Sequence, residues 1–272
     1  MQELIAYFNS IPSTHRALII VSGLCFFWLV EAGLPLFKFN YKKWQHAAFN
    51  IFFTATTVVV NVCFAYLIFL TSEYTYTNGI GLLHIVPLPL WASLLTGLLV
   101  LDLVGAYLVH LTEHKVKFMW RFHMVHHADE QVDTTTANRH HPGESIFRAV
   151  FTLAAVAILG APMWLVMLYQ SVSVVLSQFN HANIQLPEKL DSIIRWVLVS
   201  PNMHKVHHHY TRPETDTNYG NIFSIWDRLF GTYYYVPMQQ LHYGLDVLEG
   251  EPTQNLLKQL KLPFNRAIKT DE

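Results

Sequence analysis

Four long stretches of apolar residues dominate the first 178 residues of the chain. They cover residues 17–37, 47–70, 82–109 and 145–178. A helix needs about 20 residues to cross the roughly 30 Å hydrocarbon core of a bilayer, so each of the first three stretches predicts one membrane-spanning helix. Pro87 and Pro89 place the start of the third helix just after them, because proline is tolerated in the first turn of a helix but disrupts its interior.

The fourth stretch is too long for a single crossing. As one helix, its 34 residues would extend about 50 Å at about 1.5 Å per residue. Gly160, Ala161 and Pro162 divide it into two halves that are each slightly short of a full span. We therefore predict a helical hairpin that enters and leaves the membrane on one side, with a single tilted or kinked helix as the alternative.

Basic residues in the short loops indicate the orientation. Six of them follow the first and third stretches: Lys38, Lys42, Lys43, Lys115, Lys117 and Arg121. The loop over residues 71–81, after the second stretch, has none. Because Lys and Arg are enriched in cytoplasmic loops, we expect the first and third stretches to end in the cytoplasm and the N-terminus to lie outside.

From about Pro187 the sequence becomes a mixture of polar and charged residues with Pro- and Asn-rich turns. We interpret the chain as one domain over residues 1–272, with membrane helices over 17–178 and a cytoplasmic cap over 179–272. The predicted fold class is all-α: an integral-membrane bundle of three spanning helices and a helical hairpin, with a histidine-rich helical cap.

The composition supports a membrane protein with an unusual histidine content. Apolar residues make up 52% of the chain and charged residues 14%, against about 25% charged in typical soluble proteins. A formal net charge of −1 argues against a strongly basic nucleic-acid binder. Cys25 and Cys63 are too few for a disulfide framework, a zinc ribbon or a cysteine-ligated iron–sulfur cluster. Of the 16 histidines, twelve lie between His110 and His209.

Eight of these histidines have the spacing of metal ligands. They are His110 and His114 in HLTEH, His123, His126 and His127 in HMVHH, and His204, His207 and His208 in HKVHH. Residues three or four apart share one face of a helix, so each cluster can direct several imidazoles at one place. Neutral imidazole binds iron, zinc, copper and nickel, and eight histidines exceed the three or four ligands of one zinc ion. The pattern predicts two metals in a shared cavity.

Four further residues are candidates for this site. His181, in FNHAN just beyond the predicted hairpin, is a ninth potential ligand, and His141, before Pro142, is a weaker one. Asp102 lies eight residues before His110 on the third helix and could orient a ligand imidazole or join two helices. Asp102 and Glu31 both lie in membrane-spanning stretches, where an ionisable side chain indicates a functional role, although no partner can be named for Glu31.

These motifs carry a resemblance to a known family. HLTEH (110–114), HMVHH (123–127), RHHPGE (139–144), HKVHH (204–208) and DTNYGNIFSIWDRLFGTY (216–233) resemble, in this order, the fatty acid hydroxylase/sterol desaturase superfamily. Its members are integral-membrane, non-haem di-iron oxygenases of lipids. The resemblance covers residues 102–233. It implies that the eight clustered histidines bind two iron ions, with His181 as a ninth ligand and zinc as a potential substitute, and that O2 is a co-substrate.

The expected function is O2-dependent oxidation of a membrane lipid, with the metal site facing the cytoplasm. Hydroxylation of a C–H bond is the first reading, and sterol or lipid desaturation with the same ligands is the alternative. A haem electron carrier would need only one or two histidines per haem, within the spans, and a zinc protease would need HExxH rather than HLTEH.

Monooxygenation needs two electrons from outside the substrate. Cys25 and Cys63 cannot hold a cluster, and no GxGxxG motif for a dinucleotide is present. We therefore expect a separate electron donor: a cytochrome b5-like protein, a ferredoxin-type protein or a tetrahydropterin.

Overall fold

The computed structural model describes residues 1–270. The longer helices are α2 (Ser13–Gly33), α3 (Lys43–Thr77), α4 (Leu90–Asp102), α7 (Pro142–Leu159) and α8 (Met163–His181). The shorter helices are α1 (Gln2–Asn9), α5 (Val109–Lys115), α6 (Lys117–His127), α9 (Glu188–Ile194), α10 (Pro201–His207), α11 (Ile225–Leu229) and α12 (Leu256–Lys261). A π-helical segment, η2 (Leu103–Leu108), joins α4 to α5. The 3-10 segments are η1 (Leu82–His84), η3 (Thr134–Asn138), η4 (Glu214–Asp216), η5 (Met238–Gln240), η6 (Asp246–Leu248) and η7 (Leu262–Phe264).

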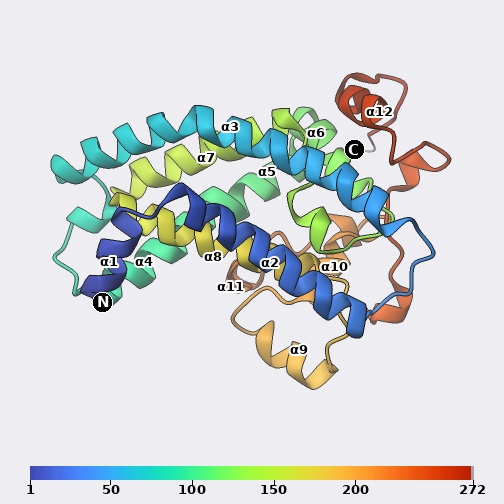
Figure 1. Cartoon of the computed structure of the whole chain (residues 1–272), viewed down its shortest axis with the longest axis horizontal. Coiled ribbons are helices and arrows are strands. Elements are labelled where there is room, and N and C mark those ends of the chain that lie inside the picture. The colour runs from blue at the N-terminus through green and yellow to red at the C-terminus, as the bar shows by residue number, and fades with distance from the viewer. Residues whose placement is uncertain (271–272) are drawn as a thin grey trace.

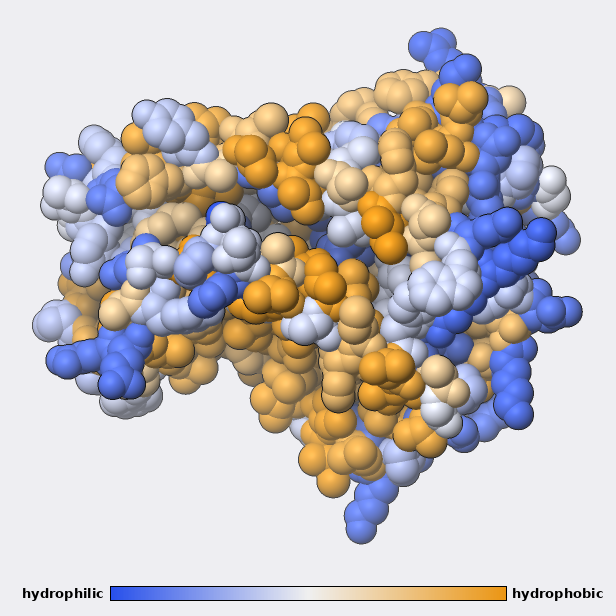
Figure 2. Space-filling view, viewed as in Figure 1, coloured by the Kyte–Doolittle hydropathy of each residue, from blue (hydrophilic) through white to orange (hydrophobic). Residues whose placement is uncertain are grey.

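The predicted all-α membrane bundle is confirmed. β-structure in the described residues is limited to three isolated bridges. Four helical segments are long and apolar enough to cross a membrane: 13–33, 43–84, 90–115 and 142–159. Figure 2 shows hydrophobic side chains gathered over the middle of one face and hydrophilic ones concentrated at the end where the C-terminal segment lies. This distribution is the one expected of a helical bundle embedded in a bilayer.

The fourth apolar stretch forms the predicted hairpin. Gly160 ends α7 in the left-handed conformation, with φ 67°, which glycine adopts without the steric cost of a side chain. Pro162 then precedes α8, and the two helices run in opposite directions (Figure 1). α7 packs mainly against α3, whereas α8 packs against α1 and α2. The far ends of both arms reach the histidine-rich region, so a single tilted helix is excluded.

The helix of the third apolar stretch begins after Pro89 and ends before Val116. Pro89, at φ −62°, precedes α4, and the helix continues through η2 and α5 to Lys115. Val116 then adopts an extended conformation, and α6 packs back against α5. This sharp reversal brings the second histidine cluster next to the first.

The cap packs on the histidine-bearing helices. α10 lies against α8, and the C-terminal η7 lies against α6. Part of the cap surface is apolar: Ile193, Trp196 and Val197 beside α9, and Leu229 and Phe230 at α11, are all exposed. The sequence did not predict this surface, because its side chains come from two short segments about 30 residues apart. It adds to the hydrophobic lower part of the face in Figure 2, where α9 lies.

Candidate metal centre

All nine histidines predicted as metal ligands come together at the ends of four helices. α5 and α6 carry the first two clusters, α8 ends at His181, and α10 leads into the last cluster. The side chains are buried and form two groups, within each of which one ligand atom per residue lies within 4.8 Å of the others. The five-histidine group is His110, His114, His123, His127 and His207; the four-histidine group is His126, His181, His204 and His208.

The two HxxHH motifs divide their side chains between the groups in opposite ways. In the first motif, His123 and His127 join the five-histidine group and His126 joins the four-histidine group. In the second motif, the outer residues, His204 and His208, join the four-histidine group and the middle residue, His207, joins the other. Each group therefore depends on both α6 and α10.

The distances within the groups fit nitrogen atoms that share a metal ion. The Nε2 atom of His123 lies 3.1 Å from that of His110 and 3.2 Å from that of His127. In the other group, the Nε2 atom of His181 lies 3.2 Å from that of His126 and 3.1 Å from that of His204. Two nitrogens bound to one metal at about 2.0–2.1 Å, with bond angles near tetrahedral or octahedral, lie about 2.9–3.4 Å apart.

Several ring nitrogens in the groups also have no hydrogen-bonding partner. They include Nε2 of His114 and His207 and both ring nitrogens of His208, all buried. Buried polar atoms nearly always have a partner, and a bound metal ion would provide one for a single nitrogen of each ring. The residues present therefore fit a metal centre.

The electrostatic environment favours the metal-binding form of the rings. Burial is the largest cause that lowers the pKa well below its ordinary value for His123, His126, His127, His204, His207 and His208. Neighbouring histidines lower these pKa values further. The six rings are therefore neutral at pH 7, and neutral imidazole is the form that binds metals.

Hydrogen bonds at the opposite ring nitrogen fix the direction of five imidazoles. The Nδ1 partners are Tyr219 O for His110 (2.9 Å), Asp216 Oδ1 for His114 (3.1 Å), Glu144 Oε1 for His123 (2.8 Å), Ser177 O for His181 (2.8 Å) and Thr217 O for His207 (2.7 Å). A carbonyl oxygen only accepts hydrogen bonds, so Nδ1 of His110, His181 and His207 donates and the Nε2 lone pair of these rings is left for a metal.

A buried pair of carboxylates next to His123 was missed by the sequence reasoning. Glu113 and Glu144 form a third potential ligand group with His123. Arg148 bridges them, with its NH2 atom 2.7 Å from Glu113 Oε2 and its Nε atom 3.0 Å from Glu144 Oε1. Both glutamates stand inside the motifs HLTEH and RHHPGE, and Arg148 is four residues beyond Glu144, so the i,i+4 spacing was the available signal.

Asp102 joins α4 to Trp226 of α11, the second of its two predicted roles, rather than orienting a ligand histidine. Its carboxylate accepts hydrogen bonds from the backbone N–H groups of Ile222 (3.2 Å) and Phe223 (3.1 Å) and from Trp226 Nε1 (3.0 Å). Eight residues of helix separate it from His110, which is about 12 Å along the axis and too far for a direct contact. Asp102 instead holds the loop whose Tyr219 carbonyl accepts from His110.

His141 lies outside both histidine groups. Its Nδ1 accepts the backbone N–H of Gly143 and so caps the start of α7, and its Nε2 lies 3.2 Å from Leu260 O. A cap is the favoured role here because Pro142 begins the helix and the first N–H groups need acceptors. The structure therefore gives His141 a structural role in place of the weaker ligand prediction.

Glu31 has partners that the sequence could not identify. Its Oε1 accepts the backbone N–H groups of Thr134 (2.7 Å) and Asn183 (2.8 Å), and its Oε2 lies 3.7 Å from Lys43 Nζ. Asn183 follows His181 by two residues. Glu31 thus anchors α2 to the segment that carries His181.

The loop after the last cluster is braced by a second buried carboxylate. Asp227 accepts the backbone N–H groups of Tyr219 (2.7 Å) and Gly220 (2.9 Å), and burial raises the pKa of Asp227 to about 6. Asn218, at φ 53°, donates to the carbonyl oxygens of Met203 and Tyr234. These contacts hold the loop and set the position of the Tyr219 carbonyl.

The Asp216→Asn variant is expected to bind metal about 10–100-fold more weakly, because loss of a partner that orients a ligand imidazole has an effect of this size. The change removes the negative charge beside His114 Nδ1 but keeps the volume of the side chain. Metal affinity is measured by chelator competition, with Glu214→Gln in the same turn as the control. Equal affinities for the two variants would contradict the proposed role of Asp216.

Comparison with known proteins places this geometry in a family. The model of the fatty acid hydroxylase family matches residues 94–232, just over half of the 272 residues. The ornithine lipid hydroxylase OlsE of Rhizobium tropici is 28% identical over 180 residues, which are 65% of this chain and 52% of that protein. The alkylglycerol monooxygenase of Xenopus tropicalis is 32% identical over 164 residues, which are 59% of this chain and 35% of that protein.

A third relative, a cholesterol 25-hydroxylase-like protein of Danio rerio, is 30% identical over 129 residues, which are 46% of this chain and 49% of that protein. The chain thus spans about half, or less, of the length of these relatives. No solved structure matches it. The matched region contains every histidine of both groups and the loop that braces them, and the chain belongs to the fatty acid hydroxylase family.

Proposed function

We propose that this protein hydroxylates a lipid with O2 at a centre of two iron ions held by the nine histidines. The observation that carries the proposal is the pair of buried, converging imidazole groups at the end of an apolar helical bundle. Two relatives support the reaction class, because they are named as an ornithine lipid hydroxylase and an alkylglycerol monooxygenase. The identity of the metals comes from the family resemblance, and zinc could occupy the same ligands.

The chain's own residues would prepare the site for this chemistry. Two bound iron ions would supply the reduction of O2 and an oxidant able to attack an unactivated C–H bond. The Nδ1 hydrogen bonds of His110, His123 and His207 fix these rings, and their Nε2 atoms would bind the metals. The protein's part is this orientation, together with the exclusion of water by burial. Arg148 forms an ion pair with each of Glu113 and Glu144 beside the five-histidine group.

Two further parts of the proposal concern the surroundings of the site. The basic residues after the first and third spans support a cytoplasmic position for the histidines. The two electrons that monooxygenation consumes would come from a separate donor at that side, either a cytochrome b5-like or ferredoxin-type protein or a tetrahydropterin. Cys25 and Cys63, on α2 and α3, are too few to hold a cluster of their own.

Mass spectrometry of lipid extracts from cells with and without the protein tests the reaction. A lipid that gains one oxygen is the expected product, and a lipid that loses two hydrogens would identify desaturation instead. The purified protein should contain two metal ions per chain and should be inactive until O2 and an electron donor with its reductase are added. One metal or none after anaerobic iron loading, or sustained turnover without reductant, would overturn the proposal.

A further inference from the structure

A cavity of about 470 Å³ lies between the loop after α2 and the C-terminal segment. Four aromatic rings line it: Phe37, Phe39, Tyr210 and Tyr243. The rings of Phe37 and Tyr243 meet edge to face, with centroids 5.4 Å apart, and Phe39 lies 6.2 Å from Tyr243. Such a partial box of aromatic faces attracts a cation through the negative potential of the rings.

Carboxylates add negative charge to the same cavity. Glu130 and Glu249 line it, and no Lys or Arg is found among the described residues that do so, although His242 is present. The cavity therefore favours a positively charged ligand.

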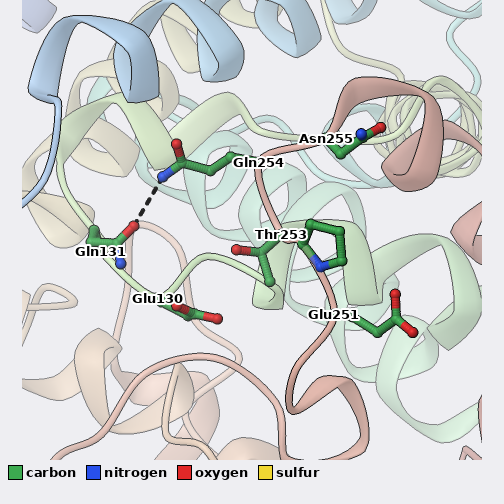
Figure 3. Close-up of a pocket in the computed structure, with 7 residues that line it drawn as sticks. Glu130, Gln131, Glu251, Thr253, Gln254 and Asn255 are labelled. Carbon is green, nitrogen blue, oxygen red and sulfur yellow. Dashed lines mark hydrogen bonds between the residues drawn. The ribbon is translucent and has the colours of Figure 1, made fainter.

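A polar depression adjoins the cavity and extends its acidic character. Figure 3 shows Glu130 and Glu251 on either side of Thr253, with Gln254 donating to Gln131 over 3.0 Å. Glu130, Gln131 and Thr253 also line the aromatic cavity. The depression thus lies beside the aromatic cavity and shares one of its two carboxylates.

Three segments of the cavity wall are tied to histidines of the site. Tyr210 follows His208 by two residues, and Glu130 follows His127 by three. The backbone N–H of Phe37 donates to Asn183 Oδ1 over 3.0 Å, and Asn183 Nδ2 donates to Phe37 O over 2.8 Å; Asn183 itself follows His181 by two residues. The cavity is thus held next to the histidine groups by short, direct connections.

We propose that this aromatic cavity binds the ammonium group of a lipid headgroup and so positions the lipid beside the histidine groups. The aromatic rings and the two carboxylates would bind the cation. The proposal rests on the proposed function in taking that lipid as the substrate. The cavity and its ligand can be tested without any turnover.

Native mass spectrometry of the full chain in detergent provides the test. Dioleoyl phosphatidylcholine and dioleoyl phosphatidylglycerol have the same acyl chains, but only the first has an ammonium group. We expect the choline lipid to bind about 10-fold more tightly. The Tyr210→Leu variant should weaken binding of the choline lipid about 5-fold and leave the glycerol lipid unchanged, since one cation–π contact contributes a factor of this order.

The charge and source of the ligand are tested by two further comparisons. A Glu130→Gln/Glu249→Gln double variant should reduce the preference for the choline lipid to less than about 2-fold, whereas Glu73→Gln, an exposed position on α3, should keep it. Equal binding of the two lipids by the unaltered protein would overturn the proposal, as would binding of free choline as tightly as of the choline lipid. Correct lipid preference without any lipid oxidation would instead count against the proposed function alone.

Discussion

The His208→Ala variant is expected to lose lipid oxidation by more than about 100-fold and to lose bound metal. Both ring nitrogens of His208 are buried and have no hydrogen-bonding partner. The substitution therefore breaks no hydrogen bond within the protein and removes only a proposed metal ligand. Removing a group that only orients a ligand costs about 10–100-fold in affinity or activity, and removing a direct ligand should exceed this. Elemental analysis and product formation are measured on the same preparation.

The neighbouring histidine provides a matched control. His209 lies outside both histidine groups, and its Nδ1 accepts the backbone N–H of His242 over 3.2 Å. Its replacement by Ala should cost about 1 kcal/mol of stability and leave two metals per chain. Retention of both metals by His208→Ala, or their loss from His209→Ala, would show that the assignment of the four-histidine group is wrong.

The Arg148→Met variant should be strongly destabilised even though no metal ligand is altered. Glu113 and Glu144 are fully buried, and Arg148 forms ion pairs with both. Breaking a buried ion pair by removing one partner costs about 3–5 kcal/mol, because the remaining charge is left uncompensated. Methionine keeps much of the volume, so the loss would come from charge rather than from packing.

The loss of stability is measured by thermal unfolding of the detergent-purified protein. The loss of monodisperse protein with temperature is the readout. Arg266→Met changes an exposed arginine on the C-terminal segment. It should change the free energy of unfolding by less than about 0.5 kcal/mol and so leave the midpoint temperature nearly unchanged. Additional replacement of Glu113 and Glu144 by Gln should recover much of the stability lost in Arg148→Met. Equal midpoints for Arg148→Met and Arg266→Met would mean that the two glutamates do not depend on Arg148.

The long apolar stretches and the histidine spacing predicted most of the fold and of the candidate site. Each long apolar stretch became a helix, and the turn at Gly160 and Pro162 divided the fourth one, because these signals are local in sequence. The spacing of HxxHH likewise shows which imidazoles share a helical face. It cannot show that His123 and His126 serve different groups, since that depends on how α6 lies against α10.

Contacts between distant residues account for what the sequence did not predict. The hydrogen bond of His114 to Asp216 joins positions 102 residues apart, and that of His110 to Tyr219 joins positions 109 residues apart. Asp102 was assigned to a nearby histidine on its own helix, but its partners are 120 to 124 residues away. Spacing along one helix gives no information about such pairs.

Each HxxHH motif supplies histidines to both groups, and this has a consequence for biogenesis. In a chain emerging from the ribosome, residues 110–127 are synthesised well before residues 204–208. Until then, neither the five-histidine group nor the four-histidine group can be complete. A product truncated before the last motif would lack His207 from the five-histidine group and two of the four residues of the other group. Neither histidine group would then be complete until the membrane helices that precede the last motif have been synthesised.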